Sequence, residues 1–198
     1  MPETTETIDF SWWPKLKVLR GVWGKGFRNV TGCKKLETFA VSKYKPASRS
    51  LELIEEFHSL LCVELIQSVI DNLNGIERLS RLEILRLSYI PKLKDISSLK
   101  THVRHMTVLE FDHCKNVNNF SVIGHLTALK QLKILSCGSI SSLSFLKDLK
   151  KLELLSFAGT VISDGDLSVC LKLPNLRYIG FEDRNGYTHR NTEIQKML

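Results

Sequence analysis

Apolar residues recur along this chain in a six-residue pattern, LxxLxL, that returns at nearly constant spacing. It reads LEILRL at 82–87, MTVLEF at 106–111, LKQLKI at 129–134, LELLSF at 152–157 and LRYIGF at 176–181. The fourth positions are therefore 24, 23, 23 and 24 residues apart, at Leu85, Leu109, Leu132, Leu155 and Ile179. A fixed period of roughly 20 to 29 residues is typical of a solenoid built from stacked turns.

The same pattern extends toward the N-terminus with less regular residues. LETFAV contributes Phe39, LLCVEL contributes Val63 and LKVLRG contributes Leu19. We therefore expect about eight turns over residues 16–184. Between residues 44 and 75 the spacing is less clear, and we expect an irregular insertion there whose register stays open.

Within each repeat the pattern predicts a strand followed by a helical segment. The two apolar residues of LxL point inward from a short strand, and the residue between them points outward. Apolar residues then follow in threes, as in Ile140, Leu143 and Leu146, which predicts a short helix or 3₁₀ turn facing the same core. One turn cannot bury its apolar face alone, so stability comes from stacking.

Another position recurs three residues after the sixth residue of LxxLxL. It holds Ile90, Cys114, Cys137 and Thr160 in four successive repeats. Asn or Cys takes this place in the pattern LxxLxLxxN/C, so the chain resembles the leucine-rich repeat family, in particular its short bacterial type. The resemblance implies a single α/β solenoid domain, with a curved parallel sheet on the concave face and short helices or 3₁₀ turns on the convex face. Cys114 and Cys137 are expected to stack in a packed ladder.

Both ends of a solenoid expose its core, so caps are expected. Residues 1–15 form the predicted N-terminal cap, in which Phe10, Trp12 and Trp13 cover the core; a ligand-stacking tryptophan pair is the alternative. Residues 185–198 form the predicted C-terminal cap, which turns at Asn185-Gly186 and ends in a helix that begins at Asn191.

The composition indicates a soluble protein of the cytoplasm. Hydrophobic residues make up 43% and charged residues 25% of the chain, and no apolar run is long enough to cross a membrane. The stretch MPETTETIDFSWWPK lacks the basic start and apolar run of a signal peptide. Five scattered cysteines suggest reduced thiols.

The net charge of +7 is unevenly placed. Residues 1–49 hold ten basic and four acidic side chains, a net of +6, which leaves +1 for the rest. A basic end could attract an acidic protein or a nucleic acid, or could simply be solvated. Nucleic acid is the less favoured partner, because basic and aromatic residues are not interleaved along one groove.

No group of residues has the spacing of a catalytic, cofactor or metal site. HVRHM at 102–106 and DHC at 112–114 do not match the compact spacing of zinc ligands. Asp164 and Asp166 lack the other ligands of a calcium loop and suit the start of a helical turn. We expect no enzymatic activity, no cofactor and no metal.

The outward residues of the strands, and those just after them, are the candidates for binding a protein, because the resemblance implies that the sheet face is the binding face. Aromatic residues and arginine among them are favoured at interfaces. The face is expected to run from basic to acidic along the chain. The candidates are Arg20, Trp23, Lys43, Glu64, Arg86, Tyr89, Glu110, Asp112, His113, Lys133, Tyr178, Glu182 and Asp183.

The chain also loosely resembles stand-alone bacterial immunity proteins of the leucine-rich repeat family, with the ending LRYIGFEDRNGYTHRNTEI carrying the likeness. This resemblance implies a monomer that binds a cognate toxin domain one to one and occludes its active site, in competition between bacteria of the contact-dependent growth inhibition type. The alternatives are a cytosolic scaffold or regulator of another protein and, less favoured, nucleic-acid binding through the basic N-terminal third.

Overall fold

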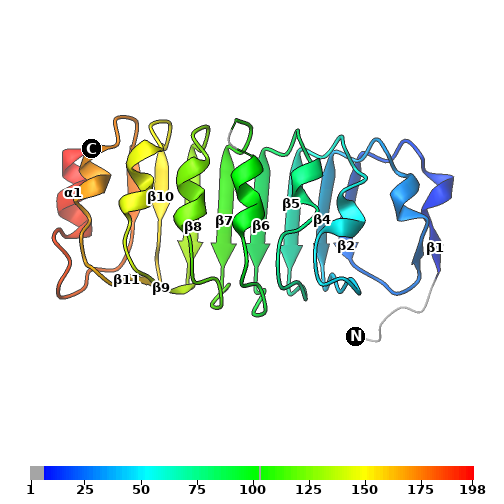
Figure 1. Cartoon of the computed structure of the whole chain (residues 1–198), viewed down its shortest axis with the longest axis horizontal. Coiled ribbons are helices and arrows are strands. Elements are labelled where there is room, and N and C mark those ends of the chain that lie inside the picture. Colours follow the sequence, from blue (N-terminus) through cyan, green and yellow to red (C-terminus); the bar gives the residue numbers. More distant parts are fainter. Residues whose placement is uncertain (1–6, 103) are drawn as a thin grey trace.

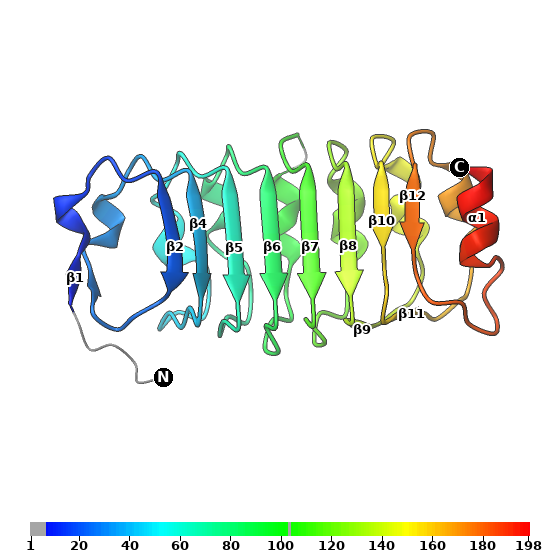
Figure 2. The same ribbon diagram turned by 180° about the vertical axis from the view of Figure 1, so that it is seen from behind.

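The computed structural model describes residues 7–102 and 104–198, which form one curved solenoid with a parallel sheet along its length. Within these residues each turn contributes one strand, and neighbouring strands pair in chain order with one register (Figure 2). The strands are β2 (Val18–Val22), β4 (Thr38–Ser42), β5 (Cys62–Ile66), β6 (Ile84–Ser88), β7 (Val108–Asp112), β8 (Gln131–Leu135), β10 (Leu154–Ser156) and β12 (Tyr178–Gly180).

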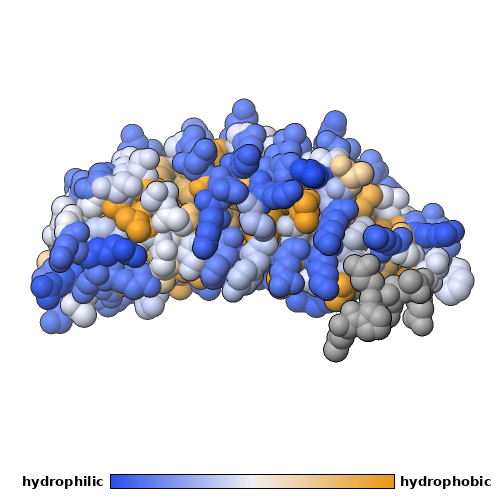
Figure 3. All heavy atoms as spheres, turned by 90° about the horizontal axis from the view of Figure 1, so that it is seen from below, coloured by the Kyte–Doolittle hydropathy of each residue, from blue (hydrophilic) through white to orange (hydrophobic). Residues whose placement is uncertain are grey.

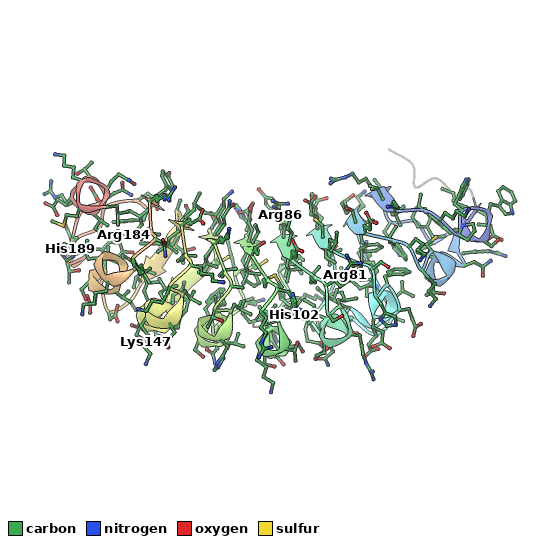
Figure 4. The ribbon with its side chains drawn as sticks, turned by 90° about the horizontal axis from the view of Figure 1, so that it is seen from above. Arg81, Arg86, His102, Lys147, Arg184 and His189 are labelled. Carbon is green, nitrogen blue, oxygen red and sulfur yellow. The ribbon has the colours of Figure 1, made fainter. Side chains whose placement is uncertain are left out.

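Short 3₁₀ helices cover the opposite side of the sheet (Figure 1), and the sheet lines the inner, concave curve (Figure 4). The 3₁₀ helices are η1 (Phe10–Trp12), η2 (Val30–Gly32), η3 (Glu52–Ile54), η4 (Ile76–Arg78), η5 (Ser97–Thr101), η6 (Ser121–His125), η7 (Ser144–Asp148) and η8 (Ser168–Lys172). Two small parallel pairs, β1 (Ile8–Asp9) with β3 (Phe27–Arg28) and β9 (Gly138–Ile140) with β11 (Thr160–Ile162), join the layers, and α1 (Asn191–Met197) ends the chain.

The register confirms the repeat read from the sequence. The eight predicted fourth positions pair in one continuous row across the sheet, from Leu19 to Ile179. The irregular insertion expected at 44–75 is wrong, because this stretch holds η3 and β5 in turns of ordinary length. Its apolar spacing looked irregular because large aromatic residues fill two core positions: Phe57 stands where the next turn has Leu79, and Tyr44 stands where the following turns have Ser68 and Ile90.

The predicted cysteine ladder is a buried column beside the strand ends. The Cys114 thiol lies 3.4 Å from the Leu87 carbonyl oxygen. In the next turn Cys137 donates its N–H to the Thr160 hydroxyl at 3.0 Å, and that hydroxyl donates to the Ile134 carbonyl at 2.7 Å. All five cysteines are buried free thiols. The contact with Cys137 and burial raise the pKa of the Cys114 thiol. Both thiols lie inside the core, where they contribute to packing.

The residue that follows each central strand has a left-handed backbone. Lys43, Gln67, Tyr89, His113 and Ser136 have φ values of 57°, 51°, 55°, 53° and 50°. Their N–H groups donate to carbonyls of the next turn, as from Tyr89 to the Asp112 carbonyl at 2.8 Å. The chain therefore turns sharply at one rim of the sheet, and these side chains project from that rim at the same point of successive turns.

The two caps differ from each other. At the N-terminus Phe10 is buried and packs edge-on against Phe27 at 5.0 Å between ring centroids, whereas Trp12 is 75% exposed and Trp13 about half exposed. The expectation that both tryptophans cover the core is therefore wrong, because Phe10 takes that place. At the C-terminus a helix begins at Asn191 as expected, and its Ile194 is buried against the last turn.

Candidate protein-binding surface

A row of alternating charges runs along the middle of the concave face. Five outward side chains form it, and we call it the charged row: Arg20, Glu64, Arg86, Glu110 and Lys133. Glu64 contacts Arg86 at 2.6 Å and Arg20 at 3.3 Å. Glu110 contacts Lys133 at 3.4 Å and Arg86 at 3.8 Å.

The register of the strands explains this row. Residues directly opposite on neighbouring strands lie side by side, so Glu64, Arg86 and Glu110 are adjacent rungs. Arg20 is separated from Glu64 by Ala40, whose short side chain lets the arginine reach across it. The carboxylates are the more sheltered partners, with Glu64 22% and Glu110 19% exposed. The expected gradient from basic to acidic is therefore wrong for the centre of the face, where the signs alternate.

Apolar side chains border the charged row. Val18 and Tyr178 are exposed on one side of it, and Val22 and Ile66 are exposed on the other. They occupy the first and fifth positions of their strands, where side chains also point outward. Sequence reasoning missed Val18, Val22 and Ile66, although the two-residue alternation of a strand would have found them.

An aromatic pair lies on the rim where the central strands end. The rings of Tyr89 and His113 stack with centroids 4.4 Å apart and planes inclined by 15°. The His113 Nδ1 lies 2.6 Å from an Asp112 carboxylate oxygen, which fixes the orientation of the imidazole. Tyr89 is 48% exposed, so the pair presents one large ring to a partner. Polar side chains predominate on the rest of this rim (Figure 3).

Some sequence-predicted candidates have other contacts. Trp23 is half-buried and packs against core aromatics, including Tyr44 at 5.2 Å. Glu182 accepts the N–H of Gly159 at 2.7 Å, and Asp183 accepts the N–H of Asn191 at 2.7 Å. Trp23 thus packs within the N-terminal turns, and Glu182 and Asp183 form hydrogen bonds within the C-terminal turns. Lys43 and Tyr178 are exposed as expected.

In the folded chain, acidic side chains of later turns offset part of the positive charge of the N-terminal third. Four of its side chains pair with acids of later turns: Lys17 with Glu37, Arg20 with Glu64, Lys34 with Glu56 and Arg49 with Asp71. Among residues 7–102 and 104–198, no group of three or more His, Cys, Asp or Glu is arranged to hold a metal ion. In the same residues no helix has the length and apolarity needed to cross a membrane.

Three solved structures from Listeria monocytogenes have the same architecture. Internalin C2 superposes with a TM-score of 0.65 and 21% identity, over 76% of this chain and 63% of its own. The internalin InlF gives 0.60 and 21%, over 78% of this chain and 45% of its own. The functional domain of InlJ, which includes a cysteine ladder, gives 0.57 and 17%, over 89% and 47%.

The chain has the leucine-rich repeat fold. The Listeria proteins share this fold with it at low sequence identity, and the chain spans about half to two thirds of their length. Neither a protein-family model nor a curated protein sequence matches the chain. The leucine-rich repeat architecture explains why outward residues at the same position of successive repeats lie in one row across the sheet.

Proposed function

We propose that this leucine-rich repeat protein is a non-catalytic module that binds another protein on its concave face. The charged row carries the proposal. Each inner member contacts oppositely charged neighbours on both sides, so these side chains are already held in place before binding. Pre-organised side chains lose less conformational entropy when a partner covers them. Paired charges also avoid the cost of burying an unpaired one.

The side chains around the row supply the anchoring groups. A few residues, most often tyrosine, tryptophan and arginine, contribute most of the binding energy in protein interfaces. Tyr89 with His113, and Ile66 one strand away, give such a cluster beside Arg86. The surface therefore combines an ordered centre, in which the charges alternate in sign, with aromatic and apolar anchors at its border, which suits a folded protein better than a polyanion.

Within this class we propose an immunity protein of the cytoplasm that binds a bacterial toxin domain one to one and occludes its active site. A curved, rigid face can enclose the convex part of a globular domain. The five buried free thiols suit a reducing compartment. A scaffold or regulator of a cellular protein would use the same face, and the identity of the captured partner separates the two.

The test is affinity capture from the protein's own cells at moderate and high salt, with tagged wild-type and variant chains. Glu110→Lys and Tyr89→Ala should lower recovery of one dominant partner, and Lys147→Glu on the convex side should not (Figure 4). A partner that is toxic when expressed alone and harmless together with this chain supports the immunity role. Equal recovery by all variants refutes binding on the concave face.

A further inference from the structure

The two edges of the sheet are finished differently. At the β12 edge the terminal helix satisfies the outward backbone groups. Gln195 accepts the N–H of Ile179 at 3.2 Å and donates to the Arg177 carbonyl at 3.0 Å. Asn191 donates to the carbonyls of Ile179 and Phe181 at 3.4 and 3.2 Å. Side chains of α1 thus replace the strand that would come next.

The β2 edge has no such cover among the described residues. β2 is the last strand of the sheet and pairs with β4 alone, as Figure 2 shows. Thr38 donates to the Lys17 carbonyl at 2.9 Å and Trp23 donates to the Ser42 carbonyl at 2.8 Å. Backbone groups of alternate residues in a parallel strand face the same side. Those of Val18, Arg20 and Val22 therefore face away from β4.

The side chains of the same three residues point to the concave face. They are the first members of the three outward rows. Val18 and Val22 are each about half exposed, and Arg20 is 62% exposed with one carboxylate partner, Glu64. The other two basic residues of the charged row each contact an acid on an adjacent strand: Arg86 contacts Glu64 and Glu110, and Lys133 contacts Glu110. The next position beyond Arg20 would continue the alternation with an acid.

We propose that the β2 edge binds an extended peptide segment of a partner protein, which adds a strand to the sheet with a carboxylate opposite Arg20 and apolar residues two positions to either side. Three outward N–H and three outward C=O groups supply the backbone hydrogen bonds, as in other cases of strand addition. Val18 and Val22 select the apolar side chains, and Arg20 selects the charge.

A second copy of this chain fits the edge less well. Antiparallel pairing of two β2 strands centred on their middle residue would place Arg20 opposite Arg20, and like charges directly opposite destabilise a pair. β2 contains no proline, so each outward residue of this edge keeps its backbone N–H for an added strand. The β2 edge lies at the N-terminal end of the concave face, whereas Tyr89 and His113 lie on the rim beside the central strands.

The probe is a fluorescent peptide, TVTETVT, which presents valine, glutamate and valine on one side in either direction of pairing. Anisotropy should show binding to the full chain, and TVTKTVT should bind about tenfold more weakly. Arg20→Glu should reverse that preference. In nitrogen-proton spectra the peptide should shift the amides of Val18, Arg20 and Val22 more than those of Leu19 and Gly21.

Two protein variants separate this site from others. Val22→Pro removes one outward N–H at a sheet edge, where proline is tolerated, so binding should fall while the unfolding midpoint is kept. Tyr89→Ala should leave peptide binding unchanged.

Equal affinity for the glutamate and lysine peptides refutes the proposal. So does a dimer in sedimentation that Val22→Pro dissociates, because the occupant is then a second copy. It is likewise overturned if the peptide binds only after residues 1–6 are removed.

Discussion

Replacing Glu64 by glutamine tests whether the charged row is an energetic unit. The carboxylate is mostly sheltered and contacts two arginines, Arg86 at 2.6 Å and Arg20 at 3.3 Å. Glutamine keeps the volume of the side chain but removes its charge. The variant therefore loses two ion pairs at once and leaves two guanidinium groups on the same row without the acid between them.

The magnitude follows from the exposure of each pair. Exposed ion pairs contribute about 0.2 to 1 kcal/mol, with sheltered and short pairs at the upper end. We assign about 1 kcal/mol to Arg86–Glu64 and about 0.3 kcal/mol to Arg20–Glu64, because Arg20 is far more solvated. Glu64→Gln should then lower the free energy of unfolding by about 1 to 1.5 kcal/mol, or roughly 2 to 6 °C in the melting temperature.

The assay is urea unfolding of Glu64→Gln, Arg86→Gln, Arg20→Gln and the two double variants. Double-mutant cycles isolate each pair, and the coupling of Glu64 to Arg86 should exceed that to Arg20. Both couplings should shrink in about 1 M salt, where the Debye length falls to about 3 Å. The exposed pair Lys17–Glu37 is the matched control and should show less coupling. No measurable coupling between Glu64 and Arg86 would refute an ordered charged row.

Three further predictions concern the stability of the fold. Tyr44 is fully buried and its hydroxyl has no hydrogen-bond partner among the described residues, so Tyr44→Phe should raise the free energy of unfolding by about 1 kcal/mol; a loss measured in urea would mean that the hydroxyl is bonded. Burial lowers the pKa of His102, whose Nε2–H donates to the Ile76 carbonyl at 2.7 Å. The neutral His102 therefore contributes fully to the free energy of unfolding above the unfolded pKa of 6.5, and this contribution is lost as the pH falls below 6.5. His102→Gln should flatten the decline in unfolding free energy between pH 7.5 and 5.5, and an unchanged slope contradicts this. Gly75 has φ 99°, and a Cβ there would lie 2.6 Å from the Leu51 backbone, so Gly75→Ala should lower the melting temperature by several degrees, and a neutral result would contradict the packing.

The sequence predicts the register of this fold because the register depends on a single short pattern. Once Leu85, Leu109 and Leu132 stand one period apart, stacking turns must bring them side by side. The alternation within a strand then assigns Arg86 and Glu110 to the outer face without further information. The fold and the membership of the charged row both follow from this local rule.

Other features depend on contacts that no local pattern records. In the N-terminal cap Phe10, rather than Trp12, is the buried aromatic residue, and it packs against Phe27 of β3, a contact between residues 17 positions apart in the chain. The pairing of Arg20 with Glu64 depends on the small size of Ala40 between them. The positive φ of Tyr89, which brings its ring against His113, is a property of the turn rather than of the residue.

The most direct test of the account places a photoreactive benzophenone amino acid at single sites and irradiates cells that express the chain. The sites are Tyr89 and Ile66 on the binding side, with Lys147 on the convex side as the control. Binding on the concave face predicts a covalent product with one and the same protein from Tyr89 and Ile66 and none from Lys147. A product from Lys147 alone would place the partner on the convex face and contradict the central claim.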